Sequence, residues 1–305
     1  MHGGRAVHRA ACRAVRFSPD GRGLYTASSD HKVLGISVDN SAVAWTGKHE
    51  AAVNALLVGT SDIVFSGDDD GCVKMWDMRL KGDAVLSFTE NEDFISDLWY
   101  QEDKKQLVCP SGDGTVAVYD IRKGNLFAMS DPIEDEHMSV VVLKHGRKCV
   151  TGTQGGVLNI FSWGDWGDMK DRYPGHPNSI DTIVKIDEDT IFTGSADGII
   201  RVVQLQPNKL LGVIGDHEGF PVERIALSHD KSFLASCSHD STVKFWDVGY
   251  IFEEDDGEDD DEADSDDSDD SDAMDDGERA AAARRKAKGK QKVQQPSTNP
   301  FFGDL

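Results

Sequence analysis

The sequence has few cysteines and no long hydrophobic run. Its 305 residues include five cysteines, none of them in Cys-x-x-Cys spacing, so we expect neither a zinc site nor a disulfide framework. No segment approaches the roughly 18 consecutive apolar residues that a membrane-spanning helix needs. The first residues also lack the apolar core of a secretory signal peptide. These absences predict a soluble intracellular protein with reduced thiols and no membrane partner.

Catalytic and nucleotide-binding motifs are missing as well. The sequence has no G-x-S-x-G, no phosphate-binding Walker loop and no H-E-x-x-H, and these are the short motifs that most directly indicate hydrolases, nucleotide-binding enzymes and metalloproteases. We therefore expect a protein that is not an enzyme, with no metal and no cofactor.

Negative charge is abundant but unevenly distributed. The net charge is −23; residues 253–278 hold 18 acidic residues and no basic one, whereas residues 279–292 hold seven basic residues and no acidic one. Residues 1–252 are only mildly acidic, with 36 acidic and 25 basic residues. This part has no overall electrostatic footprint for DNA or RNA, although a local basic patch stays open, so direct nucleic-acid binding is undecided.

One sequence phrase is repeated six times. Each copy has a short apolar strand, a small-residue step, often Asp-Gly, and then an alternating strand that ends at an aromatic position, frequently followed by Asp. The six closing positions are 40 to 43 residues apart and are Ile36, Trp76, Tyr119, Phe161, Val203 and Trp246. This period and ending are typical of a four-stranded blade of a WD40 β-propeller. We predict an all-β WD40 propeller over residues 1–252, with little helix.

The sequence leaves the closure of the ring open. After Trp246-Asp247 only residues 248–252 precede the acidic run, and they are a short candidate for the last outer strand. Six copies fit either a closed six-bladed ring or six blades of a seven-bladed fold that lacks its first blade. An open seam would expose apolar faces and strand edges.

A longer connection, residues 162–178, joins the fourth and fifth copies. It contains Trp163 and Trp166 beside glycines, and we expect it to include an irregular outer strand. Long loops often carry function, but these tryptophans could equally cap the edge of a blade. The sequence does not decide between the two interpretations.

Ser, His and Asp recur together in the copies. In propellers such residues form a buried hydrogen-bond chain from the indole N–H through Ser and His to Asp. A catalytic triad would occur once, in a pocket, so we interpret the repeated set as structural and nearly exclude a hydrolase. The two full sets are His49, Ser66, Asp70 and Trp76, and His217, Ser236, Asp240 and Trp246; partial sets are His8, Thr26 and Asp30, and His176, Thr193 and Asp197.

Two consecutive copies end in the box W/Y-D-x-R. The boxes are Trp76-Asp77-Met78-Arg79 and Tyr119-Asp120-Ile121-Arg122. They resemble the box through which propellers of cullin 4 ubiquitin ligases contact the damaged-DNA-binding adaptor. An Arg on the turn is suited to bidentate pairing with a carboxylate. Ordinary turn chemistry is the alternative explanation.

The end of the chain has a biased composition. We predict two disordered segments, an acidic one over residues 253–278 and a basic one over residues 279–305 that ends in an apolar docking motif beginning at Phe301. The acidic segment favours phosphorylation by acidophilic kinases at Ser265, Ser268 and Ser271. The basic segment favours nuclear targeting through Arg284, Arg285, Lys286, Lys288, Lys290 and Lys292, with an RNA-contacting arm as the alternative.

Beyond the generic repeat, the chain resembles the WD repeat-containing protein 55 family from residue 12 to its end. The stretches that carry the likeness are Cys12-Arg-Ala-Val-Arg-Phe17, Ser66-Gly-Asp-Asp-Asp-Gly-Cys-Val-Lys-Met-Trp76, Gly152-Thr-Gln-Gly155, Ser162-Trp-Gly164 with Lys170-Asp-Arg172, Ala226-Leu-Ser-His-Asp-Lys231 and Phe301-Phe-Gly-Asp-Leu305. The resemblance implies a nuclear, nucleolus-enriched protein that supports ribosomal RNA production and cell proliferation. It also implies association with the cullin 4 adaptor in plant members, and usually seven blades, of which this chain would lack the first.

The leading hypothesis is therefore a monomeric, non-enzymatic scaffold of the nucleus and nucleolus that holds ribosome-assembly factors. The cytoplasm is the alternative location. A compatible second hypothesis is a substrate receptor of a cullin 4 ubiquitin ligase that binds the adaptor through Arg79 and Arg122. A third is a chaperone that holds basic proteins with its acidic tail.

Overall fold

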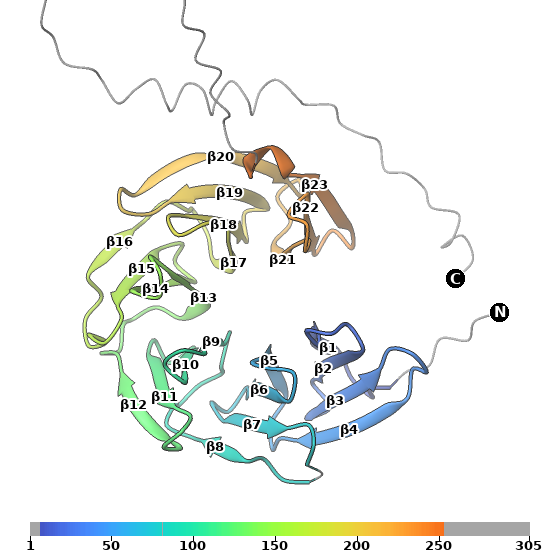
Figure 1. Cartoon of the computed structure of the whole chain (residues 1–305). Helices are drawn as coiled ribbons and strands as arrows, with labels where there is room; N and C mark the ends of the chain where they lie inside the picture. Colours follow the sequence, from blue (N-terminus) through green and yellow to red (C-terminus); the bar gives the residue numbers. More distant parts are fainter. Residues whose placement is uncertain (1–6, 81, 253–305) are drawn as a thin grey trace, which may run out of the picture.

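The computed structural model describes residues 7–80 and 82–252, which form six antiparallel sheets around a common axis (Figure 1). The sheets are the six blades of a β-propeller, so the all-β prediction is confirmed. Within the described ranges the one helical element is the single 3₁₀ turn η1 (Gly249–Ile251). None of their helices is long and apolar enough to cross a membrane.

The first five blades have four strands each, paired in chain order. Blade 1 contains β1 (Cys12–Phe17), β2 (Gly23–Ser28), β3 (Lys32–Ser37) and β4 (Val43–Lys48). Blade 2 contains β5 (Val53–Val58), β6 (Ile63–Asp68), β7 (Val73–Asp77) and β8 (Leu86–Phe88). Blade 3 contains β9 (Trp99–Gln101), β10 (Gln106–Pro110), β11 (Val116–Asp120) and β12 (Asn125–Met129).

Blade 4 contains β13 (His137–Leu143), β14 (Lys148–Thr153), β15 (Leu158–Ser162) and β16 (Asp171–Tyr173). Blade 5 contains β17 (Ile180–Lys185), β18 (Thr190–Ser195), β19 (Ile199–Gln204) and β20 (Lys209–Asp216). Blade 6 has three strands among the described residues, β21 (Val222–Leu227), β22 (Phe233–Ser238) and β23 (Val243–Asp247).

The repeated glycine shapes the turn between the second and third strands. Gly71, Gly114, Gly156 and Gly198 all have a positive φ, between 78° and 86°, which L-residues rarely adopt. A Cβ at Gly114 would lie 2.2 Å from the carbonyl oxygen of Ile133 in the connection to the next blade. The glycine therefore allows the turn and also lets the following connection approach it.

The hydrophobic core lies between neighbouring blades. The closing aromatics Trp76, Tyr119 and Phe161 are fully buried, and Phe88 of blade 2 stacks on Tyr119 of blade 3 with ring centroids 4.1 Å apart. Burial of such a side chain stabilises the fold by roughly 2–3 kcal/mol. Because Trp76, Tyr119 and Phe161 each pack against the blade before their own, the repeat in the sequence becomes a repeat of interfaces around the ring.

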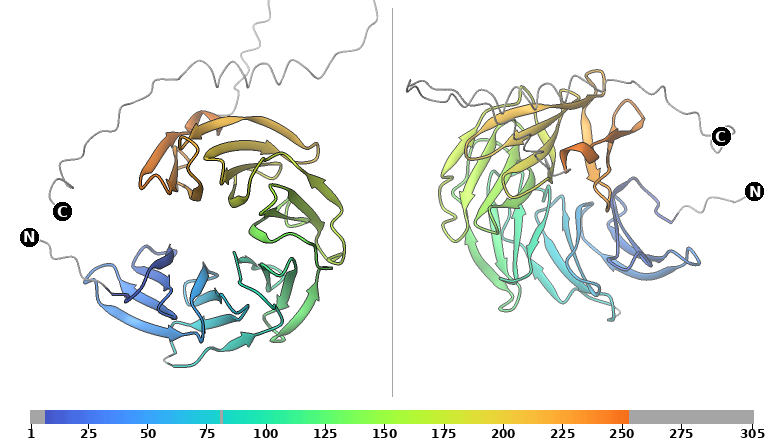
Figure 2. Two further views of the ribbon diagram at one scale, coloured as in Figure 1. Left: turned by 180° about the vertical axis from the view of Figure 1, so that it is seen from behind. Right: turned by 45° about the horizontal axis from the view of Figure 1, so that its top comes forward.

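The ring is open between blade 1 and blade 6 (Figures 1 and 2). In blade 5, Ile200 and Val202 are 0% and 7% exposed because blade 6 covers them, whereas the equivalent Val243 and Phe245 of blade 6 are 61% and 70% exposed. On the other side of the opening, Phe17 of β1 is also exposed. The six described blades thus leave one sheet face of blade 1 and one sheet face of blade 6 uncovered.

The prediction of an outer strand in residues 248–252 is wrong. These residues form the 3₁₀ turn η1, in which the N–H of Ile251 donates to the carbonyl of Val248 and the N–H of Phe252 to that of Gly249, at 3.0 Å each. Val248 is fully buried and packs in the core cluster shared with blade 5. This local turn satisfies the backbone without pairing to β23.

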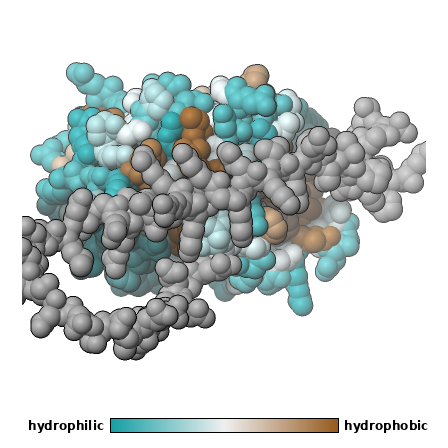
Figure 3. All heavy atoms as spheres, turned by 90° about the horizontal axis from the view of Figure 1, so that it is seen from above, coloured by the Kyte–Doolittle hydropathy of each residue, from teal (hydrophilic) through white to brown (hydrophobic). Residues whose placement is uncertain are grey.

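The turns of the blades separate into two faces. Face I carries the turns between first and second strands and between third and fourth strands; face II carries the turns between second and third strands and the connections between blades. This follows from the up-and-down pairing of every blade. Seen from the side of β20, the surface is mainly hydrophilic with a few separate hydrophobic areas (Figure 3).

Candidate interaction sites on the propeller

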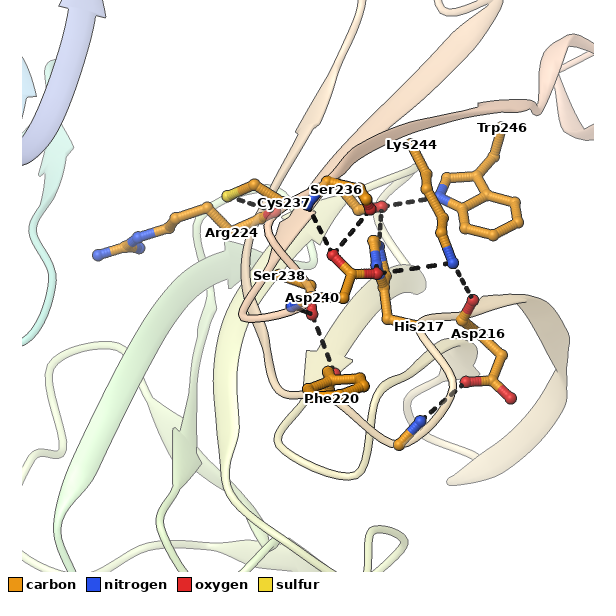
Figure 4. Close-up of polar contacts among 12 residues, drawn as sticks. Asp216, His217, Phe220, Arg224, Ser236, Cys237, Ser238, Asp240, Lys244 and Trp246 are labelled. Carbon is orange, nitrogen blue, oxygen red and sulfur yellow. Dashed lines mark hydrogen bonds and ion pairs between the residues drawn. The ribbon is translucent and has the colours of Figure 1, made fainter. Parts of the chain in front are cut away.

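The hydrogen-bond chain expected from the repeats is present in blade 6 (Figure 4). Trp246 Nε1 donates to Ser236 Oγ at 2.8 Å, and Ser236 Oγ lies 2.7 Å from His217 Nε2. His217 Nδ1 lies 2.7 Å from Asp240 Oδ2. Burial favours a higher pKa for Asp240, but hydrogen bonds from His217 and Thr242 outweigh it and hold that pKa well below its usual range. These bonds link β22, β23 and the turn between them to the connection that enters the blade.

In blade 2 the hydrogen-bond chain ends at Asp68 and not at Asp70. The prediction of Asp70 as its carboxylate is therefore wrong. His49 Nδ1 lies 2.7 Å from Asp68 Oδ2, and His49 Nε2 lies 2.7 Å from Ser66 Oγ, which accepts from Trp76 Nε1. Asp68 occupies the end of β6, where blade 6 has the shorter Ser238. Its carboxylate also accepts the N–H groups of Asp70 and Cys72, while Asp70 stays exposed at the tip of the turn.

The partial set of blade 5 differs from the prediction in its carboxylate. His176 Nε2 contacts Thr193 Oγ1 at 2.8 Å, as expected. Asp197, however, forms a bidentate ion pair with Arg201, and His176 Nδ1 has no described partner. Burial, with the nearby Arg201 charge, lowers the pKa of His176 to about 4. The blade 1 set of His8, Thr26 and Asp30 is formed.

These networks do not have the accessibility of a catalytic site. Ser66, Ser236, His49 and His217 are all buried. A nucleophile and its base need a substrate within hydrogen-bond reach. The arrangement is suited to satisfying polar groups beneath a turn and stiffening the blade.

A group with metal-ligand chemistry occurs in blade 2. One ligand atom each of His49, Asp68 and Cys72 lies within 4.8 Å of the others. Both ring nitrogens of His49 are already engaged by Asp68 and Ser66. Burial raises the pKa of the Cys72 thiol, whereas a metal ligand would be the thiolate. The three residues therefore fit a hydrogen-bonded structural network better than a metal centre.

The first W/Y-D-x-R box is closed on itself. Arg79 lies on the face I turn between β7 and β8 and donates from Nε and Nη2 to the carboxylate of Asp77, at 2.9 and 2.6 Å. Asp62 lies 3.6 Å from the same guanidinium. The hydrogen bonds from Arg79 lower the pKa of Asp77 to about 2. Although Arg79 is 66% exposed, its charge is balanced locally.

The second box is more open. Arg122 follows β11 on face I and is 70% exposed, and its Nε lies 3.9 Å from Asp120 Oδ1. Asp120 is buried and already accepts the backbone N–H groups of Arg122 and Lys123 at 3.0 and 3.1 Å. The guanidinium of Arg122 is therefore freer to pair with a partner than that of Arg79.

Comparison with known proteins places the chain in a family. The sequence model described as WDR55 matches residues 4–251. "WD repeat-containing protein 55" of Arabidopsis thaliana is 43% identical over 81% of this chain and 70% of its own length. The chain belongs to the WDR55 family. The "WD repeat-containing protein 55 homolog" of Dictyostelium discoideum is 40% identical over 82% of this chain and 60% of its own length. The human "WD repeat-containing protein 55" is 36% identical over 80% of this chain and 64% of its own length.

The chain thus spans less than two thirds of the Dictyostelium and human WDR55 relatives. The sites predicted beyond Phe252 lie outside the described residues of this WDR55 family member. They are Ser265, Ser268, Ser271, Arg284, Arg285, Lys286, Lys288, Lys290 and Lys292.

The tryptophan-rich connection of this WDR55 chain caps its own blade. Trp166 is buried and lies near Phe161, with ring centroids 6.4 Å apart. Trp163 donates from Nε1 to Gln106 Oε1 of blade 3 at 2.9 Å, and Lys104 Nζ lies 4.0 Å from its ring centroid. The connection therefore also ties blade 4 to blade 3, and it contains the short outer strand β16.

His137 is a buried residue that the sequence pattern did not single out. Strand β13 begins at His137, which pairs with Thr153 as Val53 of blade 2 pairs with Asp68. His137 is fully buried, and both its ring nitrogens lack a described partner. Burial lowers its pKa to about 4. Alignment of the copies on their second strands would have found it.

Proposed function

We propose that this protein is a non-enzymatic protein-interaction scaffold of the nucleus and nucleolus that supports ribosomal RNA production and ribosome assembly. The observation that carries the proposal is that Ser-His-Asp groups are buried inside the blades, whereas the two W/Y-D-x-R arginines are exposed on the turns of face I. In this proposal the protein acts by binding partner proteins through the exposed side chains of its turns. The sequence likeness supports the nucleolar setting.

A complementation experiment tests this proposal. Cells depleted of their own family member receive either the full chain or a chain lacking residues 284–292, and ribosomal RNA precursors are measured by metabolic labelling together with protein localisation. The full chain should restore precursor processing and concentrate in the nucleolus. The deletion should shift the protein toward the cytoplasm and restore less. Unchanged precursors after depletion would contradict the proposal.

A second, compatible function is supported by the two boxes. Arg79 and Arg122 lie on face I turns of neighbouring blades, and we propose that they bind the adaptor of a cullin 4 ubiquitin ligase. Because Arg79 is paired with Asp77, Arg122→Ala should reduce capture of purified adaptor more than Arg79→Ala. Arg172→Ala, at another exposed arginine, is the control. Equal capture by the Arg79→Ala/Arg122→Ala double variant and the wild type would exclude this function.

A third proposal concerns the acidic segment, residues 253–278. Its 18 carboxylates would hold histones or basic ribosomal proteins by charge. Deletion of the segment should then abolish salt-sensitive binding of purified histones, measured by sedimentation. Binding that survives the deletion would remove the chaperone role.

A further inference from the structure

A cluster of cations lies on face I, where blades 3 and 4 meet. It comes from three turns, between β9 and β10, between β11 and β12, and between β13 and β14. All five members are exposed or half-buried on these turns, and Lys104 also reaches across the blade boundary. The members of this cation patch are Lys104, Lys105, Arg122, Lys123 and Arg147.

Direct contacts show that the patch is contiguous. The N–H of Ile121 donates to the carbonyl of Lys105 at 3.0 Å, joining the two blade 3 turns. Lys104 Nζ donates to the carbonyl of Gly146 at 2.6 Å, joining blade 3 to blade 4. The backbone N–H of Trp163 donates to the carbonyl of Arg147 at 2.8 Å. Residues from separate turns are therefore fixed beside one another.

The cations of the patch outnumber the carboxylates that pair with them. Asp120 is the shared partner of Arg122 and Lys123, at 3.9 and 3.8 Å, and it is buried. Lys105 lies 3.6 Å from the exposed Glu102. Within the described ranges Arg147 forms no ion pair, and its Nε donates to the carbonyl of Lys144. With Asp103 of the same turn also counted, five cations face three carboxylates, so the patch keeps a positive charge although the protein is strongly acidic.

The opposite face of the same blades has the opposite charge. On face II the described turns and connections of blades 3 and 4 at residues 89–95, 111–115, 130–136 and 154–157 contain eight carboxylates and no lysine or arginine. Charges further apart than about 8 Å are largely screened in physiological salt. A polyanion would thus be repelled by face II and attracted to the patch on face I.

We propose that the cation patch binds the phosphate backbone of single-stranded RNA without reading its sequence. Several cations on separate turns can each meet a different phosphate. Trp163 lies beside Lys104, whose Nζ is 4.0 Å from its ring centroid, and it packs edge-to-face with Trp166. Its indole is half-buried next to these cations and can contact a base, which an acidic peptide lacks. This inference goes beyond the proposed scaffold role, and it does not depend on adaptor binding.

The test measures binding of the full chain to a fluorescently labelled oligouridine of about 20 nucleotides by anisotropy, across a salt series. The variant Lys105→Glu/Lys123→Glu/Arg147→Glu leaves both box arginines intact. The matched control, Arg9→Glu/Arg22→Glu/Lys209→Glu, makes the same charge change at exposed sites elsewhere. The milder Lys105→Gln/Lys123→Gln/Arg147→Gln variant guards against misfolding of the first, with circular dichroism as the check.

The patch variants should weaken RNA binding by about tenfold or more at about 0.15 M salt, and lower the slope of log affinity against log salt by about 2, because each phosphate contact in a single strand contributes about 0.7. The control should bind as the wild type does. Equal loss in control and patch variants, or no binding by the wild type, would overturn the proposal. So would displacement of the RNA by polyglutamate of equal charge at an equal concentration, which would assign the patch to acidic proteins.

Discussion

At the scale of residues, the Ser-His-Asp networks act as internal supports of the blades. In blades 2 and 6 an indole, a hydroxyl, an imidazole and a carboxylate form consecutive hydrogen bonds within the blade. Sequence alone predicts the first three members because their positions repeat. It selects the wrong carboxylate in blade 2, since three consecutive aspartates follow Gly67 and only the backbone geometry shows which one reaches His49.

Substitution of the two aspartates in blade 2 separates these alternatives. Asp68→Asn should destabilise the propeller by on the order of 1–3 kcal/mol, because His49 and two backbone N–H groups lose a charged acceptor. Asp70→Asn should change stability by less than about 0.5 kcal/mol, since Asp70 is exposed. Urea unfolding followed by circular dichroism measures both. A larger loss for Asp70→Asn would contradict the assignment.

The buried histidines predict a pH dependence. Burial lowers the pKa of His137 and of His176 to about 4 in the folded protein, below about 6.5 in the unfolded chain. The unfolded state therefore binds more protons between these values, and stability should be full above about pH 6.5 and fall as the pH drops toward 4.

His137→Ile, which restores the apolar residue found at the equivalent Ile180, tests the contribution of one histidine. This variant should reduce the loss of stability between about pH 7.5 and about pH 5 relative to the wild type, because one group that must stay neutral is removed. Urea unfolding at the two pH values provides the comparison. An unchanged pH dependence in His137→Ile would show that His137 does not titrate in this way.

At the scale of elements, the strand order follows from local patterns that the sequence displays. Alternating strands and Asp-Gly turns identify the blades, and the four strands of five blades pair in chain order. The end of blade 6 was mispredicted because apolar residues 248–252 suit a strand and a buried turn equally. The tertiary contact that buries Val248 decides between them, and no local signal reports it.

The tight b-to-c turns, which join the second and third strands, can be tested by adding one carbon atom. Gly114→Ala should destabilise the protein by more than about 1 kcal/mol, because Gly114 has φ +79° and its Cβ would meet the carbonyl of Ile133. Gly212→Ala is the control, since nothing lies within 4 Å of its Cβ and its φ is not positive. Thermal unfolding would measure both. Equal effects would argue against a special requirement at the turn.

At the scale of the whole molecule, the open seam and the two charged faces are the main features that the sequence could not settle. Five blade interfaces are filled, and the faces of blade 1 and blade 6 that would form a sixth remain apolar and exposed. The repeats predicted the number of blades. The exposure of Val243 and Phe245 depends on whether a neighbouring blade covers them, and the identity of these two residues does not indicate that.

The seam should bind a hydrophobic dye. Val243→Thr/Phe245→Ser should lower the fluorescence of bound anilinonaphthalene sulfonate clearly below that of the wild type, because both side chains belong to one uncovered sheet face. Leu210→Ser/Val213→Ser is the control, because these exposed residues lie on β20, the outer strand of blade 5, and not at the seam. This variant should change the signal less. A larger change in the β20 variant would contradict this picture of the seam.

The central claim is that this propeller is a scaffold for ribosome-assembly proteins. The most direct measurement is affinity capture of the full chain from nuclear extract, treated with nuclease to remove RNA bridges and quantified by mass spectrometry. Capture with Trp76→Ala, which removes a buried blade support, serves as the comparison. We expect ribosome-assembly factors to be enriched with the wild type and depleted with the variant. Their absence from both captures would contradict it.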